Sequence, residues 1–377
     1  MIVNQQAFRT IWPNTIAEFL KTLRFVEIID QTKLPFAFEV VRISNLQQMI
    51  NAIKNMQVRG APLIGAAAAY GLALALEHRA DNAYLHDIAE QLVKSRPTAV
   101  NLKWAVQRML NVLLPLPDAL RKTAAWNEAA IICDEDVQLN QAIGQHGLTL
   151  IKAMSLHKGC GQSRPLNILT HCNAGWLATV DYGTALAPIY TAHDAGLAVH
   201  VWVDETRPRN QGASLTAWEL AQHGVPHTVI SDNAGGHLMQ HGEVDMVIVG
   251  ADRVTSTGDV CNKIGTYLKA LAAFDNKVPF YAAVPSPTID WEIADGIREI
   301  KIEERSAHEV AWVSGKLANG EVAEVNILPP DHLTVKTQIA NPAFDVTPAR
   351  LVTSIITEHG VYAPQQLQSL KPKAAKD

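Results

Sequence analysis

The sequence predicts an α/β protein, with a mostly helical N-terminal domain followed by a Rossmann-like domain built on a doubly wound parallel sheet. Three observations predict this class. Up to about residue 158, apolar residues recur at helical spacing. Beyond residue 165, short apolar runs alternate with helix-length segments, as in a parallel sheet covered by helices on both faces. A chain of 377 residues is also long enough for two domains with a large core.

The first part of the chain is expected to be mainly helical. Its helical segments are residues 44–56, 58–78, 96–114 and 126–154. Ser44 or Asn45 can cap the first of them. The second follows an Arg-Gly-Ala-Pro break and is almost wholly apolar, which indicates a buried helix. In the last segment we expect a glycine interruption near Gly144.

The period of the apolar pattern changes after a loop at residues 158–165. The expected strands are the runs LNILT, LAVHVWV, PHTVI, VDMVIVG and VPFYAAV. We place the domain boundary inside the long helix before the loop. The expected division is a helical domain over residues 1–135 that contributes phosphate contacts, a catalytic domain over 136–363, and a flexible polar tail over 364–377.

Composition excludes several classes of function. A net charge of -5 is unlike the basic stripes of nucleic-acid binders, so no nucleic-acid partner is expected. No run of about 20 apolar residues is present to span a bilayer. The four cysteines (Cys133, Cys160, Cys172 and Cys261) are widely spaced without a CxxC pair, which argues against structural zinc and a disulfide framework. We therefore expect a cytoplasmic protein with free thiols.

Polar residues follow four of the predicted strands. The segments after these strands begin HCNAG, DETRPRNQG, SDNAGGHLM and ADRVTSTGDVCNKIG. Carboxyl ends of parallel strands meet at one edge of a sheet, where open α/β sheets bind their ligands. Four such turns in succession predict a shared cleft.

Each candidate within this cleft also has a purely structural interpretation. Cys172 alone is more often a small buried side chain than a reactive thiol, but polar neighbours and a helix start would lower its pKa. Asp252 could act chemically, or it could cap the next turn or pair with Arg253. His171 is expected to hydrogen-bond to backbone. Cys133 and Cys160 are expected to have no role in the site.

The segment Arg59-Gly60-Ala61-Pro62 is a candidate anion site because it precedes a helix. Backbone N–H groups at a glycine turn and the positive end of a helix attract phosphate, and Arg59 adds a charged fork. Arg96 and Lys263 could serve likewise, although each could equally be a solvated surface charge. The chain has neither GxGxxG nor GxxxxGK[ST], which argues against a dinucleotide or P-loop nucleotide site.

Motifs over residues 45–350 resemble those of the methylthioribose-1-phosphate isomerase family. They are VRGAPLIGAAAAYG, THCNAG, DETRPRNQG, AGGHLM, VGADRV, GDVCNKIGTY, PSPTID and NPAFDVTP, in the family's order. The wider superfamily also holds ribose-1,5-bisphosphate isomerases and the non-catalytic regulatory subunits of a translation-initiation exchange factor. The first 40 residues match poorly, and nothing catalytic is expected of them.

The resemblance implies an aldose–ketose isomerase of the methionine salvage pathway that converts 5-methylthioribose 1-phosphate to 5-methylthioribulose 1-phosphate. It implies Cys172 and Asp252 as the catalytic pair. It also implies a set of substrate contacts, namely Arg59, Gly60, Ala61, Arg96, Gln211, Asn262 and Lys263. It further implies a homodimer without a cofactor or metal. Ser214 stands where the family usually has arginine, which could alter substrate preference.

The implied substrate sets a physical problem, because phosphate on the anomeric carbon locks the sugar as a ring. A protonated Asp252 could open it by donating to the ring oxygen, which requires a dry setting that raises the carboxyl pKa. Hydrogen must then move from C2 to C1, through an enediol with Cys172 as base or as hydride, and the sequence leaves both routes open. The alternatives are an isomerase of ribose 1,5-bisphosphate or 5-deoxyribose 1-phosphate, or a non-catalytic sugar-phosphate-sensing subunit, which the presence of both Cys172 and Asp252 argues against.

Overall fold

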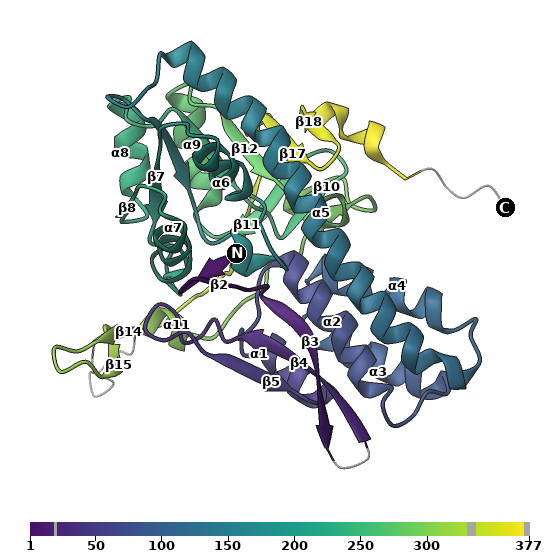
Figure 1. The fold of residues 1–377 in the computed structure, drawn as a ribbon. Helices are drawn as coiled ribbons and strands as arrows, with labels where there is room; N and C mark the ends of the chain where they lie inside the picture. The colour runs from purple at the N-terminus through teal and green to yellow at the C-terminus, as the bar shows by residue number, and fades with distance from the viewer. Residues whose placement is uncertain (19–20, 330–336, 373–377) are drawn as a thin grey trace.

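The computed structural model describes residues 1–18, 21–329 and 337–372, and it confirms the α/β class. Its central element is a seven-stranded sheet with the order β18-β17-β12-β9-β6-β7-β8 (Figure 1). The strands are β6 (Leu166–Thr170), β7 (Val199–Asp204), β8 (His227–Ile230), β9 (Met246–Val249), β12 (Phe280–Ala283), β17 (Ser354–Thr357) and β18 (Gly360–Tyr362). All pairs are parallel except β17 with β18. All five runs predicted as strands lie in this sheet.

The central predicted strands are almost wholly apolar because helices cover both faces of the sheet, whereas the edge strand β8 is partly exposed. In β9, Met246 and Ile248 face one core, and Val247 and Val249 face the other. Helices α6 (Ala187–Asp194) and α7 (Ala217–His223) line the first core, and α8 (Ala234–Gln240) and α9 (Thr266–Asp275) line the second. This alternation on two buried faces is typical of parallel sheets.

The N-terminal part is helical from residue 46 onward. Its helices are α1 (Leu46–Lys54), α2 (Ala61–Ala75), α3 (Asn82–Ser95), α4 (Val100–Leu113) and α5 (Asp118–Lys158). Of the two expected caps, Asn45 caps α1, since its side chain accepts from the Gln48 N–H. As expected, α2 is buried along nearly its whole length.

Residues before 46 differ from the mainly helical expectation. They form the antiparallel sheet β3-β4-β5, with β3 (Ile11–Glu18), β4 (Lys21–Ile29) and β5 (Val40–Ile43), and the short pair β1 (Ile2–Val3) and β2 (Gln6–Ala7). Val26, Ile28 and Ile43 of this sheet are buried against the helices. The strands are stabilised by packing on helices far along the chain, a context that local sequence pattern does not contain.

Helix α5 runs from the N-terminal helices to the sheet (Figure 1), and the expected division between residues 135 and 136 falls inside it. The predicted interruption near Gly144 is wrong, because the helix is continuous. Its glycines instead permit close approach of α6: a Cβ on Gly147 would lie 2.3 Å from Pro188 Cγ.

Smaller elements complete the fold. A second sheet has the order β13-β10-β11-β16, and β14 and β15 form a separate hairpin. Their bounds are β10 (Arg253–Thr255), β11 (Val260–Lys263), β13 (Ile289–Asp290), β14 (Trp312–Lys316), β15 (Val322–Asn326) and β16 (Phe344–Thr347), with short helices α10 (Gly296–Glu299) and α11 (His308–Ala311). No helix of the described residues is long and apolar enough to cross a membrane.

The flexible tail expected from residue 364 is wrong for its first half. Residues Pro364–Leu370 form a 3-10 helix, in which Leu367 is fully buried in the core beside α9. The Gln368 side chain donates a hydrogen bond of 2.8 Å to the Ser256 carbonyl. Apolar burial and this bond hold the segment, and residues 373–377 lie outside the described part of the chain.

The α5–α6 contact can be tested by Gly147→Leu. The added side chain must displace the rigid Pro188 ring, so we expect the free energy of unfolding to fall by at least about 2 kcal/mol. Gly161→Leu is the matched control, because a Cβ there meets nothing within 4 Å. Urea unfolding of both variants measures the difference, and equal midpoints would contradict the close contact.

Candidate active site

The candidate site lies where the strand order of the central sheet reverses. From β6 the chain continues outward through β7 and β8, and then returns to place β9 and β12 on the other side of β6. Cys172 follows the end of β6, and Asp252 follows the end of β9. Open α/β sheets bind ligands in the crevice at such a switch point.

A small pocket at this point brings together six of the nine residues that the sequence singled out. They are Arg59, Gly60, Ala61, Cys172, Asp252 and Asn262. Arg96, Gln211 and Lys263 do not line this pocket. Gln211 instead lines a larger neighbouring cavity of about 450 Å³, to which Arg59 and Ser214 also contribute. Of the four strand-end segments expected to share a cleft, those after β6 and β9 line this pocket, and those after β7 and β8 do not.

Cys172 occupies a strained turn that hydrogen bonds hold from two sides. Its φ of 67° lies in the left-handed region, which costs a non-glycine residue about 1–3 kcal/mol. The Cys172 N–H donates to Thr206 Oγ1 at 2.8 Å, and the Cys172 carbonyl accepts from Thr216 Oγ1 at 2.7 Å. The thiol lies 3.5 Å from Gln211 Oε1, its hydrogen-bond acceptor. The side chain is 6% exposed, so this turn presents a nearly buried thiol to the pocket.

Burial favours the neutral forms of the site's ionisable groups. Burial raises the pKa of the Cys172 thiol, although Arg59 and Lys263 act against the rise. This reverses the expectation of a lowered thiol pKa, because loss of water outweighs the nearby charges. Burial likewise raises the pKa of Asp252 against Lys263, Arg96 and Arg59, as the ring-opening role would require. Burial lowers the pKa of Lys263.

Arg59 is held rigidly beside Cys172. Its Nη2 donates to the Asn173 carbonyl at 2.8 Å, and its Nη1 donates to Asn173 Oδ1. The next residue, Gly60, has a φ of 96°, and a Cβ there would lie 2.5 Å from the Ala178 carbonyl oxygen. Only glycine fits this close approach, which places the N-terminus of α2, beginning at Ala61, on the pocket. A guanidinium beside a helix N-terminus is a favourable setting for an anion.

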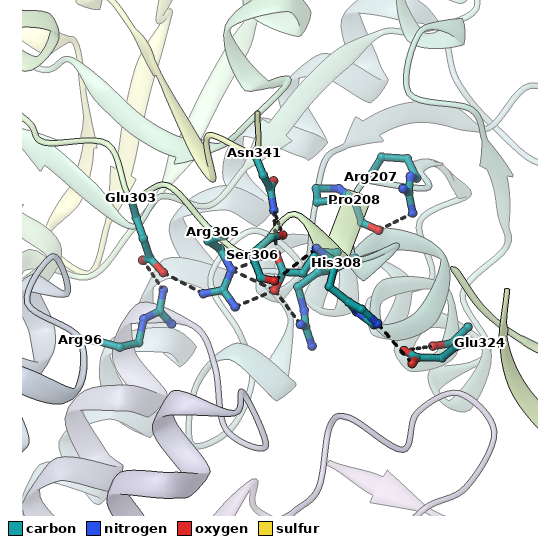
Figure 2. A network of polar contacts seen from close by, with 12 residues as sticks. Arg96, Arg207, Pro208, Glu303, Arg305, Ser306, His308, Glu324 and Asn341 are labelled. Atoms are coloured by element: carbon teal, nitrogen blue, oxygen red, sulfur yellow. Dashed lines mark hydrogen bonds and ion pairs between the residues drawn. The ribbon is translucent and has the colours of Figure 1, made fainter. Parts of the chain in front are cut away.

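Arg96 lies between α3 and α4 and ends a network of alternating charges (Figure 2). Its Nη2 lies 3.4 Å from Glu303 Oε2, and Arg305 Nη1 lies 2.8 Å from the other Glu303 oxygen. Burial raises the pKa of Glu303, but Arg96 and Arg305 outweigh it, so the net shift is downward. Arg96 Nε is buried without a hydrogen-bond partner among the described residues. Arg96 therefore has donor capacity left for a ligand.

Asn262 and Lys263 follow one another on β11. Asn262 lines the pocket, and its Nδ2 donates to Thr266 Oγ1 at 3.0 Å. The Lys263 ammonium lies 4.7 Å from the centre of the Phe344 ring. Within the described part of the chain, no carboxylate oxygen lies within 4.0 Å of this ammonium. Among the described residues, the buried Lys263 ammonium thus has the Phe344 ring as a cation–π partner and no carboxylate partner.

His171 is engaged on both sides of its ring. Its Nε2 lies 2.8 Å from the Ile264 carbonyl, which confirms the expected backbone hydrogen bond, and its Nδ1 lies 2.8 Å from Asp204 Oδ2. His171, Asp204 and Asp232 form a group with metal-ligand chemistry. However, Lys269 Nζ lies 3.2 Å from Asp204 Oδ2 and already places a positive charge there. The two Asp232 oxygens accept backbone N–H bonds.

Sequence reasoning missed the residues that hold this turn. Thr206 and Thr216 look like ordinary loop and helix residues, and Glu219 looks like a solvated acid on an amphipathic helix. Asn173 stood inside the THCNAG motif but was given no role of its own. Among the other thiols, Cys133 is buried in α5, Cys160 follows α5, and the Cys261 carbonyl accepts the Asp252 N–H at 2.9 Å.

The chain is similar to one protein family over most of its length and to several individual relatives. The model of a family described as "Initiation factor 2 subunit family" matches residues 57–364. A methylthioribose-1-phosphate isomerase of Rhodospirillum rubrum is 60% identical over 371 residues, 97% of this chain and 92% of the relative. One of Brucella anthropi is 56% identical over 375 residues, 99% of this chain and 100% of the relative.

Solved structures agree with these relatives. The crystal structure of 5-methylthioribose 1-phosphate isomerase from Pyrococcus horikoshii OT3 matches with a TM-score of 0.77 and 39% identity, covering 97% of this chain and 96% of that one. A structure described as translation initiation factor eIF-2B, subunit delta, from A. fulgidus matches with a TM-score of 0.73 and 39% identity, covering 97% and 99%. The chain belongs to the initiation factor 2 subunit family and, within it, to the methylthioribose-1-phosphate isomerase family.

Proposed function

We propose that this protein is an aldose–ketose isomerase that converts 5-methylthioribose 1-phosphate to 5-methylthioribulose 1-phosphate in methionine salvage. One observation carries the proposal: a nearly buried thiol and a carboxyl of raised pKa line one small pocket beside a guanidinium and a helix N-terminus. Relatives of 56–60% identity that bear this activity in their names support the choice of substrate.

Asp252 is proposed as the acid that opens the sugar ring. Because the phosphate on C1 prevents spontaneous opening, the ring oxygen must receive a proton as its bond to C1 breaks. Burial raises the pKa of Asp252, so its protonated form is more available near neutral pH than that of an exposed carboxyl. The same carboxyl, once ionised, can take up a proton and restore the starting state.

Cys172 is proposed to assist transfer of hydrogen from C2 to C1. In one route, its thiolate takes the C2 proton and the enediol is reprotonated at C1. In the other, C2 passes hydride directly to C1, and the pocket only has to exclude water and hold the carbons in line. Burial raises the pKa of Cys172, which disfavours the thiolate, and the positive charges of Arg59 and Lys263 favour it.

The remaining predicted residues are proposed as substrate contacts. Arg59, Gly60 and Ala61 would bind phosphate through the guanidinium fork and the first N–H groups of α2. Arg96, with an unpartnered buried Nε, would add a second fork. Gln211, Asn262 and Lys263 would hold the sugar hydroxyls and balance charge. A homodimer in the cytoplasm, acting without metal or cofactor, completes the proposal.

The substrate assignment is tested by incubating the purified protein with 5-methylthioribose 1-phosphate and, separately, with ribose 1,5-bisphosphate in D₂O. We expect ketose formation from the first substrate, followed by NMR. Faster conversion of the bisphosphate would replace the proposed substrate, and no conversion of either would favour a non-catalytic sugar-phosphate-sensing subunit. Deuterium at C1 of the product would identify the enediol route.

The catalytic pair is tested by Cys172→Ser and Asp252→Asn. Each removes one proton-transferring group, so turnover should fall at least about a hundredfold while the substrate still binds. Cys160→Ser is the control, because this thiol lies after α5, outside the pocket. Initial rates at saturating substrate decide the matter, and near-normal turnover in either variant would remove that residue from the mechanism.

The role of Arg59 is tested by Arg59→Ala. Loss of a charge-assisted fork to phosphate should raise KM by about tenfold or more, with a smaller effect on kcat. Steady-state kinetics separate the two constants. A lower kcat at unchanged KM would show that Arg59 does not serve to bind the phosphate.

A further inference from the structure

A buried acid that lines neither cavity lies directly beneath the Cys172 turn. Glu219, on α7, has no exposed surface. Its Oε1 accepts from Asn173 Nδ2 at 3.0 Å and from the Leu177 N–H at 2.9 Å. Its Oε2 accepts from the Trp176 N–H at 2.9 Å and from the Tyr190 hydroxyl at 2.8 Å. Four donors converge on one carboxyl group far from solvent.

The chain makes room for this carboxyl at the glycine of the THCNAG motif. A Cβ on Gly175 would lie 1.8 Å from Glu219 Oε2. Gly175 has an extended backbone, with a φ of -89°, so its lack of a side chain serves packing and not a special backbone conformation. Because Gly175 has no side chain, the carboxyl group of Glu219 can occupy the space beside it. Glu219 can therefore approach the turn only because the THCNAG motif ends in glycine.

Asn173 connects Glu219 to Arg59, and its amide can lie in only one orientation between them. A carboxylate only accepts hydrogen bonds, and a guanidinium only donates them. The Asn173 NH₂ group therefore faces Glu219, where Thr216 Oγ1 lies 3.2 Å away as a second acceptor. The Asn173 oxygen is consequently directed at Arg59 Nη1, and the Asn173 carbonyl accepts from Nη2.

The opposite charges of Glu219 and Arg59 also support this arrangement. Burial raises the pKa of Glu219 to about 7, while Asn173, Tyr190, the Leu177 N–H and the charge of Arg59 act to lower it. When Glu219 is ionised, it and Arg59 lie on opposite sides of one amide. Neutralising Glu219 removes one of the two groups that set the orientation of this amide.

We propose that Glu219 is a positioning residue for catalysis, which fixes the amide of Asn173 and through it the guanidinium fork of Arg59. The proposal rests on the proposed function, in which Arg59 binds the substrate phosphate. Glu219 does not touch the substrate; it determines which donors Arg59 has left for the phosphate and where they are directed.

The test is Glu219→Gln. This change keeps the size of the side chain but replaces one acceptor oxygen by an NH₂ donor. A glutamine NH₂ facing Asn173 lets that amide turn over, so that its own NH₂ meets the donors of Arg59. We expect KM for 5-methylthioribose 1-phosphate to rise about tenfold, with kcat within about threefold of wild type. Tyr190→Phe is the matched control: it removes one donor to Glu219 but leaves the Asn173 bond, so KM should stay within about twofold.

A purely structural role is separated from positioning by combining Glu219→Gln with Arg59→Lys. Lysine lacks the fork that Asn173 orients, so in that background Glu219→Gln should no longer raise KM. Equal KM effects in both backgrounds, or a normal KM in the single variant, would overturn the proposal. If Glu219→Gln does not fold, as judged by circular dichroism, Asn173→Ala breaks the same connection and must show the same KM increase and the same loss of effect. Absence of wild-type turnover of the substrate would instead refute the proposed function.

Discussion

The candidate site depends on one strained three-residue turn, His171-Cys172-Asn173, at the end of β6. Cys172 adopts a left-handed conformation that its side chain disfavours, so the turn must be held by its surroundings. Each residue of the turn is bonded to an element that lies elsewhere in the chain, and the partners come from the ends of β7, from the segment after β11 and from α7. A parallel sheet makes this possible, because it brings the carboxyl ends of successive strands to one edge.

Burial and charge act against each other throughout the site, and the balance suits a phosphorylated substrate. Burial favours neutral Cys172, Asp252 and Lys263, whereas the nearest charges of opposite sign favour their ionised forms. A phosphate dianion entering beside Arg59 and Arg96 would offset their positive charge. That would weaken their pull on Asp252 and favour its protonated form, which is the form that the proposed ring opening needs. Phosphate binding beside Arg59 and Arg96 would thus be coupled to the pKa of Asp252.

The sequence predicted those features that local patterns encode. Apolar runs flanked by helix-length segments were sufficient for five strands, because most of these strands are buried on both faces, with the edge strand β8 as the exception. The strands before residue 46 and the packed helix after residue 364 depend on partners distant in the chain, which periodicity cannot reveal. Cys172 and Asp252 share a pocket because their motifs follow the adjacent strands β6 and β9. The other four predicted residues of the pocket come from the start of α2 and from β11. Glu219 escaped prediction because an acid on a short amphipathic helix has the same pattern whether it is solvated or buried.

The close approach of Gly60 to Ala178 explains why the N-terminal helices belong to the site. Residues 60 and 178 come from different parts of the fold, yet no side chain fits between them. The contact fixes the start of α2 against the segment that follows the Cys172 turn. Elsewhere, Arg253 Nη2 donates to the Thr98 carbonyl at 2.9 Å, and Glu303 pairs with Arg96 (Figure 2). The helical part is thus attached to the sheet domain through more than one contact. The proposed phosphate site at α2, Arg59 and Arg96 would therefore keep its position relative to Cys172 and Asp252 only while these attachments persist.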